Sequence, residues 1–313
     1  MDSELNITYI TLGGHVEVEK YRYLYFLMMF TVYFLIICSN STIVYLIWLH
    51  QNLHEPMYIF IAALLLNSVL ISTAIYPKLL IDFLSEKQVI SYSACLFQCF
   101  LYYSLNGSEF LLLAAMSYDR YVSICKPLQH QTIMKKTTVR SFLGLAWFVP
   151  ACQIAVPVSL IANTKLCNFT LKGIFCNNSV YKLHCVSSRA LSVYGVIVLI
   201  NVSLLPVIFI LFTYTKIFLI TYQSRREVRM KAAQTCLPHL LVLISFSCLI
   251  TYDVVIVKLE LELPKTIHLI MTLQVIFYHP LFNPIIYGLK MKEIYNHIRR
   301  LFCQRELHQH INK

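Results

Sequence analysis

Charged residues are scarce in this chain of 313 residues. Asp, Glu, Lys and Arg together make up 13%, about half the share found in soluble domains. So few charges cannot cover the surface of a water-soluble protein, whereas a protein surrounded by lipid does not need them. Apolar residues make up 58% of the chain. The composition therefore excludes an ordinary soluble domain and favours an integral membrane protein.

Several functional patterns are also missing from the sequence. The first twenty residues contain no basic segment followed by an apolar core, so no cleavable signal peptide is expected. There is no phosphate-binding loop, no nucleophile–base pattern and no His/Cys cluster with metal-ligand spacing. Internal repeats are absent as well. These absences argue against an enzyme and predict neither a metal centre nor a cofactor.

Seven stretches without Lys, Arg, Asp or Glu are long enough to cross a bilayer, which takes roughly 20 apolar residues. They are Tyr23–Leu49, Met57–Pro77, Gln88–Ser108, Ser141–Thr164, Ala190–Thr215, Ala232–Tyr252 and Thr266–Leu289. The third continues past Glu109 to about Cys125. The sequence thus predicts an all-α, seven-transmembrane helix bundle as a single domain over residues 1–313, with a tail at 1–22, the bundle at 23–289 and a second tail at 290–313.

A short amphipathic helix is predicted after the seventh span, over Met291–Phe302. Its apolar residues share one face: Ile294, Ile298, Leu301 and Phe302. Such a helix is expected to lie on the surface of the inner leaflet. Cys303, directly after it, is a candidate for palmitoylation.

Basic residues are concentrated on one side of the predicted membrane. The connections after spans one, three and five, the C-terminal tail, and Asp119 and Arg120 at the inner end of span three hold sixteen Lys and Arg against five Asp and Glu, so the whole net charge of +11 lies there. The excess of basic residues predicts that this side is cytoplasmic and that the N-terminus is extracellular. The charge is interpreted as facing anionic membrane lipids, with no role in binding nucleic acid.

Four cysteines lie at or beyond the predicted outer edge of the membrane, where disulfides persist: Cys95, Cys167, Cys176 and Cys185. Four cysteines allow three pairings, and the sequence alone does not choose among them. Among the glycosylation motifs, Asn6-Ile-Thr8 lies in the outer tail, which makes Asn6 the preferred candidate for glycosylation.

The third span carries a polar stripe, although ionisable residues are costly within a membrane. The stripe consists of Tyr102, Asn106, Glu109, Leu113, Met116 and Arg120. Spacings of three and four place these residues on one helical face, which must point into the bundle. Two interpretations remain open. The stripe either joins helices, or it lines an outward-opening cavity above a polar relay that ends at Arg120 and its neighbour Asp119.

The seventh span contains two prolines in the segment His279-Pro-Leu-Phe-Asn283-Pro284-Ile-Ile-Tyr287. Each proline removes a backbone hydrogen bond and disturbs the preceding turn. Asn283 and Tyr287 place polar groups on one face beside this break. A hinge with a polar lining is therefore predicted here.

One segment resembles a known family closely. Met116-Ser-Tyr-Asp-Arg-Tyr-Val-Ser-Ile-Cys-Lys-Pro-Leu128 is similar to the MAYDRYVAICKPL signature of odorant receptors, a branch of the rhodopsin-like (class A) G-protein-coupled receptors. The resemblance extends over essentially the whole chain and includes Pro56-Met57-Tyr58 and Asn283-Pro-Ile-Ile-Tyr287. The segments PMYIFIAALLLNSVL and YPKLLIDFLSEKQVISY resemble the fish-type branch most.

The resemblance implies a function and a set of site residues. Its implied disulfides are Cys95–Cys176 and Cys167–Cys185. Its implied G-protein switch consists of Asp119, Arg120, Tyr121, Asn283, Pro284 and Tyr287. Its implied odorant cavity consists of Tyr102, Tyr103, Asn106, Val198, Val202, Ile250, Thr251, Val254, Leu273 and Ile276. Such a receptor would bind a small odorant, activate a stimulatory olfactory-type G protein, raise cyclic AMP and reside in the plasma membrane of olfactory cilia.

Glu109 resembles the acid that these receptors use within the third span as a cation or structural site. The usual acid of the second span is replaced around Asn67-Ser68, so a sodium ion would rest on Glu109 alone. The predicted cavity residues carry no full charge, which favours a small neutral or weakly polar ligand. The competing interpretation is an ion-coupled small-molecule transporter, since Glu109 and broken helices also suit that class.

Overall fold

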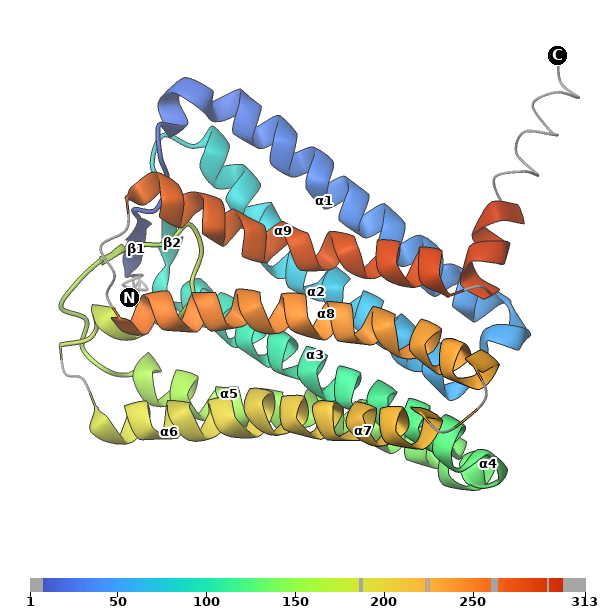
Figure 1. Ribbon diagram of the computed structural model, residues 1–313. Helices are drawn as coiled ribbons and strands as arrows, with labels where there is room; N and C mark the ends of the chain where they lie inside the picture. Colours follow the sequence, from blue (N-terminus) through green and yellow to red (C-terminus); the bar gives the residue numbers. More distant parts are fainter. Residues whose placement is uncertain are drawn as a thin grey trace, which may run out of the picture.

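The structure is a computed structural model that describes residues 8–185, 188–222, 224, 226–259, 264–291 and 293–300. Figure 1 shows long helices that run side by side. Within the described ranges there are seven long helical segments: α1 (Val18–Leu49), α2 (Pro56–Leu84), α3 (Tyr92–Cys125), α5 (Lys136–Ala162), α6 with α7 (Arg189–Leu199 and Leu205–Tyr222), α8 (Arg226–Leu259) and α9 (Lys265–Lys290). The predicted seven-helix bundle is confirmed.

Most of these helices are long and apolar enough to cross a bilayer. Among the described residues, five meet that requirement by length and composition: α1, α2, α5, α6–α7 and α9. Large apolar side chains such as Trp48, Phe148 and Phe212 are exposed on the outside of the bundle. An exposed apolar surface of this extent suits a lipid environment. The chain is a multi-pass membrane protein.

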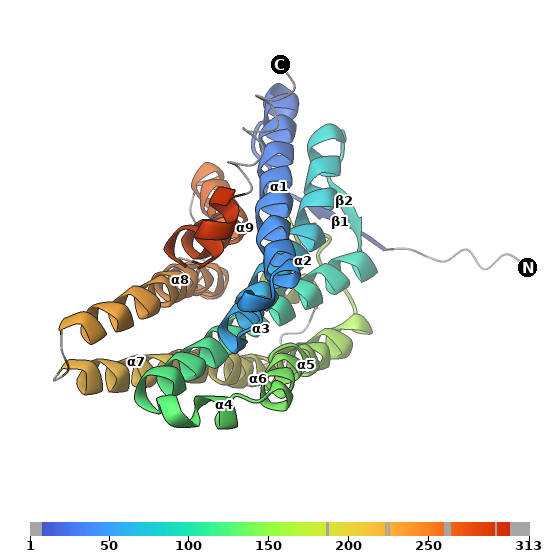
Figure 2. The ribbon, with the colours of Figure 1, turned by 90° about the vertical axis from the view of Figure 1, so that its right-hand side faces the viewer.

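Helix α3 lies in the middle of the bundle. It packs against α2, α5, α7 and α8 (Figure 2). Its buried positions include Tyr102, Asn106, Glu109, Leu113 and Met116. The polar stripe of the third span therefore points into the bundle, as predicted, and α3 can carry polar side chains because other helices shield them from lipid.

The third span begins later than the sequence predicted. Residues Val89–Ser91 form strand β2, and α3 starts at Tyr92 rather than at Gln88. The Ser91 side chain accepts a hydrogen bond from the Ala94 N–H at 3.4 Å, which caps the first turn of the helix. Backbone pairing with a strand from the N-terminus holds the preceding residues in an extended form.

That N-terminal strand, β1 (Tyr9–Leu12), is the centre of a three-stranded sheet with the order β2-β1-β3. It pairs antiparallel with β2 and parallel with β3 (Thr170–Leu171). Ile10 and Leu12 are buried beneath it. We call this sheet the strand cap, and we call the end of the bundle that carries it the disulfide end. The opposite end is called the Arg120 end.

Gly14 lies where two backbones meet at the edge of the strand cap. A Cβ atom at this position would lie 2.5 Å from the Gly173 carbonyl carbon. We expect Gly14→Ala to lower the stability of the cap by about 1–3 kcal/mol, because backbone atoms cannot move aside cheaply. A thermal melt of the detergent-solubilised protein would measure this loss. The matched control is Gly144→Ala on α5, where nothing lies within 4 Å. Equal melting temperatures for the two variants would contradict the expectation.

The amphipathic helix after α9 is present over residues 293–300. Ile294 is buried in the same core as Tyr287, whereas Tyr295 is exposed. This helix therefore packs against the bundle as well as presenting an outer face. Leu301, Phe302 and Cys303 lie outside the described residues, as does Asn6.

Candidate ligand cavity and polar relay

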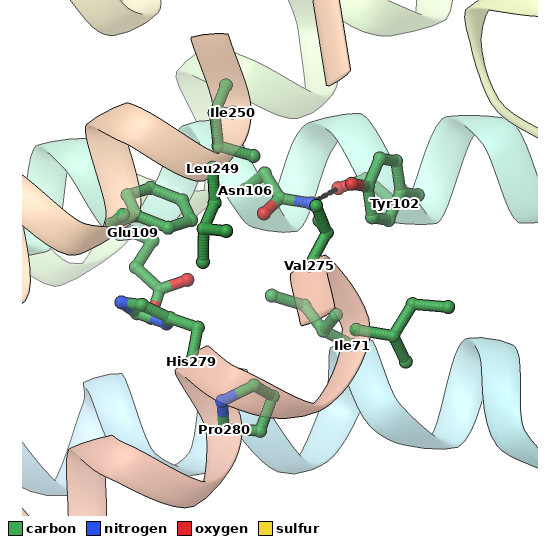
Figure 3. A pocket seen from close by; sticks show the side chains of 11 residues that line it. Ile71, Tyr102, Asn106, Glu109, Leu249, Ile250, Val275, His279 and Pro280 are labelled. Atoms are coloured by element: carbon green, nitrogen blue, oxygen red, sulfur yellow. Dashed lines mark hydrogen bonds and ion pairs between the residues drawn. The ribbon is translucent and has the colours of Figure 1, made fainter. Parts of the chain in front are cut away.

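A small cavity lies inside the bundle between α2, α3, α8 and α9 (Figure 3). Its lining consists of Ile71, Tyr102, Asn106, Glu109, Phe246, Leu249, Ile250, Val275, Ile276, His279 and Pro280. The volume is about 10 Å³, which gives room for about one water molecule. A ligand larger than that must push the helices or their side chains apart.

Four of the residues predicted for the odorant cavity line it: Tyr102, Asn106, Ile250 and Ile276. Leu273 does not, although it is buried in the same apolar cluster as Tyr102. Tyr103 points toward the long loop between α5 and α6, where its hydroxyl accepts a hydrogen bond from the Asn178 N–H at 3.0 Å.

The cavity residues predicted in the fifth span, Val198 and Val202, do not line this cavity. Val202 packs on α3, since a Cβ atom at Gly107 would lie only 2.4 Å from Val202 Cγ1. Val198 is buried nearby. A π-helix at Ile200–Leu204 changes which side chains face inward, because its wider turn shifts the helical register. Thr251 of the sixth span is exposed. The Val254 side chain is not among those that the structure describes.

The floor of the cavity is a polar cluster that joins three helices. Glu109 Oε1 accepts hydrogen bonds from His279 Nδ1 at 2.9 Å and from Asn283 Nδ2 at 3.1 Å. Asn283 Nδ2 also lies 3.1 Å from Ser68 Oγ on α2. All four residues are buried, and Glu109 is 1% exposed. We call Glu109, His279, Asn283 and Ser68 the floor cluster.

Asn40 compensates for the proline break in α9. Pro284 has no N–H, so the carbonyl of Pro280, four residues earlier, loses its helical partner. Asn40 Nδ2 donates a hydrogen bond to that carbonyl at 2.9 Å. A buried side chain of α1 thus satisfies the backbone at the predicted hinge. Pro284 and Asn283 are themselves buried.

Asn67 occupies the neighbouring polar position on α2. Its Nδ2 donates to the Leu105 carbonyl at 2.9 Å, and its Oδ1 accepts from Trp147 Nε1 at 3.1 Å. The side chain therefore ties α2 to α3 and α5. With both amide atoms occupied in this way, Asn67 stabilises the packing of three helices beside the floor cluster.

Glu109 Oε1 is not free to bind a sodium ion. Sodium, as a hard cation, binds oxygen ligands, but Glu109 Oε1 faces two nitrogen donors. Among the described residues there is no group of three or more His, Cys, Asp or Glu side chains arranged for a metal ion. At Oε1, the hydrogen atoms of His279 and Asn283 supply the positive partners that an ion would provide.

The predicted switch residues lie at the Arg120 end. Asp119 is fully buried and accepts from Arg120 Nε at 3.0 Å and from His130 Nε2 at 2.9 Å. Arg120 is 13% exposed. His130 belongs to α4 (His130–Ile133), which sequence reasoning did not single out. Asp119 therefore holds the arginine side chain against the bundle.

Tyr121 and Tyr287 complete the predicted switch set. Tyr121 is half-buried and packs against the core of the Arg120 end. Tyr287 is fully buried, and its ring centroid lies 5.6 Å from that of His239 on α8. The polar residues of α9 thus extend from the floor cluster toward the Arg120 end.

Two disulfides hold the loops at the disulfide end. Cys95 is joined to Cys176 and Cys167 to Cys185, the pairs that the resemblance implies. Next to Cys176, the Phe175 ring lies edge-on against Tyr102 with centroids 5.0 Å apart. Burial raises the pKa of Tyr181 in the same loop, so its phenol stays neutral. The long loop therefore covers the bundle directly above Tyr102.

Comparison with known proteins finds olfactory receptors in each case. Residues 29–305 match the family model described as "Olfactory receptor". The human (Homo sapiens) protein "Olfactory receptor 51E1" is 33% identical over 303 residues, which is 96% of this chain and 95% of that protein. Human "Olfactory receptor 52A5" is 32% identical over 276 residues, 87% of each chain. Human "Olfactory receptor 11A1" is 31% identical over 302 residues, 95% of this chain and 94% of that protein.

Proposed function

Because this chain belongs to the olfactory receptor family of G-protein-coupled receptors, we propose that it binds a small organic odorant in the cavity beside the floor cluster and activates a stimulatory olfactory-type G protein, which raises cyclic AMP. Members of this family are receptors and not enzymes. The membrane bundle described above supplies the fold that this function requires.

The observation that carries the proposal is the course of α3. Tyr102, Asn106 and Glu109 line the cavity, and the same helix carries Asp119 and Arg120 near its last turns, at the Arg120 end of the bundle. Any movement of α3 relative to α8 and α9 therefore changes both places together. An odorant that binds the open arrangement better than the closed one shifts the population toward it.

We also propose the orientation and location of the receptor. The disulfide end is extracellular, since disulfides persist in an oxidising environment. The Arg120 end is cytoplasmic and meets the G protein together with anionic lipids. The receptor resides in the plasma membrane of olfactory sensory cilia. We propose no sodium ion at Glu109 Oε1, where His279 and Asn283 already donate.

The test is a cyclic-AMP assay in cells that express the full chain with an olfactory G protein and are exposed to a panel of odorants. At least one odorant is expected to raise cyclic AMP in a dose-dependent manner, and cells without the receptor should not respond. Substrate-dependent uptake or current that needs no G protein would contradict the receptor function and favour a transporter.

A further inference from the structure

We propose that the odorant is a primary alkyl amine whose ammonium group binds Glu109 Oε2 at the floor of the cavity. This inference rests on the proposed function and narrows the class of ligand. The residues predicted from sequence to form the cavity carry no full charge, whereas the structure adds Glu109 and His279 to its lining. The expected ligand is therefore one that carries a group able to bind a carboxylate.

One carboxylate oxygen has no partner. Glu109 Oε1 is occupied by His279 and Asn283, whereas Oε2 has no hydrogen-bond partner in the described part of the chain. The residue is 1% exposed, so bulk water does not solvate it. Buried polar atoms without partners are costly, and a charged oxygen is the costliest kind. A donor brought by a ligand would remove that cost.

The cavity also lacks a compensating positive charge. No Lys or Arg belongs to its lining, over the residues that the structure describes. His279 Nδ1 lies 2.9 Å from Glu109 Oε1, while its Nε2 has no partner among the described residues. Glu109 is the one acidic side chain in this lining. A cationic ligand is therefore attracted and an anionic ligand is repelled.

The proposed pair is balanced in charge. An ammonium group beside the Glu109 carboxylate carries no net charge, so neither ion is left buried alone, and the cost of desolvating an isolated ion is avoided.

The cavity has room for an ammonium head, and an alkyl chain requires its walls to move apart. Its volume of about 10 Å³ holds a group of roughly the size of water. Figure 3 shows an oxygen of Glu109 and the oxygen of Asn106 facing the same space. Asn106 Nδ2 donates to the Tyr102 carbonyl at 2.6 Å, which leaves the Asn106 oxygen as an acceptor. The remaining walls are mainly apolar and suit a hydrocarbon tail: Ile71, Leu249, Ile250, Val275 and Ile276.

The first experiment uses the wild-type receptor in the cyclic-AMP assay with matched series of four- to eight-carbon primary amines, alcohols and carboxylates. Amines should be roughly 10- to 100-fold more potent than alcohols of the same length, because a charge-assisted hydrogen bond is stronger than a neutral one. Carboxylates should be inactive. Activation by neutral odorants with silent amines would overturn the inference and leave the receptor function intact. Silence toward every compound, from receptors at the cell surface, would contradict both.

The second experiment replaces the carboxylate. Glu109→Gln should remove the preference for amines over alcohols while the alcohol response persists, with potencies normalised to surface expression. The matched control is Asp82→Asn, which alters another buried acid, the partner of Lys78 on α2, and should keep the preference. An unchanged amine-to-alcohol ratio in Glu109→Gln overturns the assignment. If this variant does not reach the surface, the wild-type series decides alone.

Discussion

Replacing Arg120 with alanine is expected to abolish the cyclic-AMP response while the receptor still reaches the cell surface. Arg120 is partly exposed at the Arg120 end, and its guanidinium is held by Asp119. Asp119 keeps its bond to His130 after the substitution, so the buried acid retains a partner. The lost cation would make charge-assisted hydrogen bonds to the G protein, and each such bond is worth about 1.5–3 kcal/mol. Coupling to the G protein should therefore fall by more than tenfold, which leaves no detectable cyclic-AMP response.

The matched control is Arg140→Ala, which removes one positive charge from an exposed position on α5 near the same end. This variant should signal normally, because a single surface charge contributes little. Surface labelling of an extracellular tag and the cyclic-AMP response would be measured in parallel for both variants. A normal response from Arg120→Ala at normal surface density would refute the switch role of Arg120.

Breaking the longer disulfide should have the second large effect. Cys95 and Cys176 are 81 residues apart in sequence, whereas Cys167 and Cys185 are 18 apart. On a chain-entropy estimate the longer loop is stabilised by about 4.5 kcal/mol and the shorter one by about 3 kcal/mol. Cys176→Ser also releases Phe175 from Tyr102 above the cavity. We expect this variant to lose most of its surface expression and all of its odorant response.

Cys185→Ser should cost less, and Cys152→Ser should cost nothing, since Cys152 is a free and exposed cysteine of α5. Flow cytometry of labelled, unpermeabilised cells would rank the three variants. A surface level of Cys176→Ser equal to that of Cys152→Ser would show that the longer disulfide is dispensable.

Hydropathy and periodicity were sufficient to predict the helices. Apolar runs identify the spans because a helix makes all the backbone hydrogen bonds within one segment, as lipid requires. The spacing of Tyr102, Asn106 and Glu109 predicted one inward face of α3, and all three are buried there. Such signals are local, so the sequence contains them within a few turns.

Other features depend on partners that are distant in sequence. His279 appears in the sequence as a residue before a proline, and nothing local connects it to Glu109 on another helix. His130 meets Asp119 only because the chain turns back after α3. The resemblance implies Val198 and Val202 for the cavity, and the π-helix at Ile200–Leu204 shifts the helical register beside them. Strand β1 escaped prediction because four residues carry little periodicity and both its partners lie far along the chain.

The position of β1 at the centre of the strand cap has a consequence for biosynthesis. Strand β1 can complete its hydrogen bonds only after Thr170 has been synthesised, since Thr11 pairs with that residue. At about 5–20 residues per second, the strand waits on the order of ten seconds with its edges open. During this interval the nascent chain offers an unpaired strand to chaperones and to other chains. A tag or fusion placed directly before Tyr9 would therefore act on maturation and export before it acted on ligand binding.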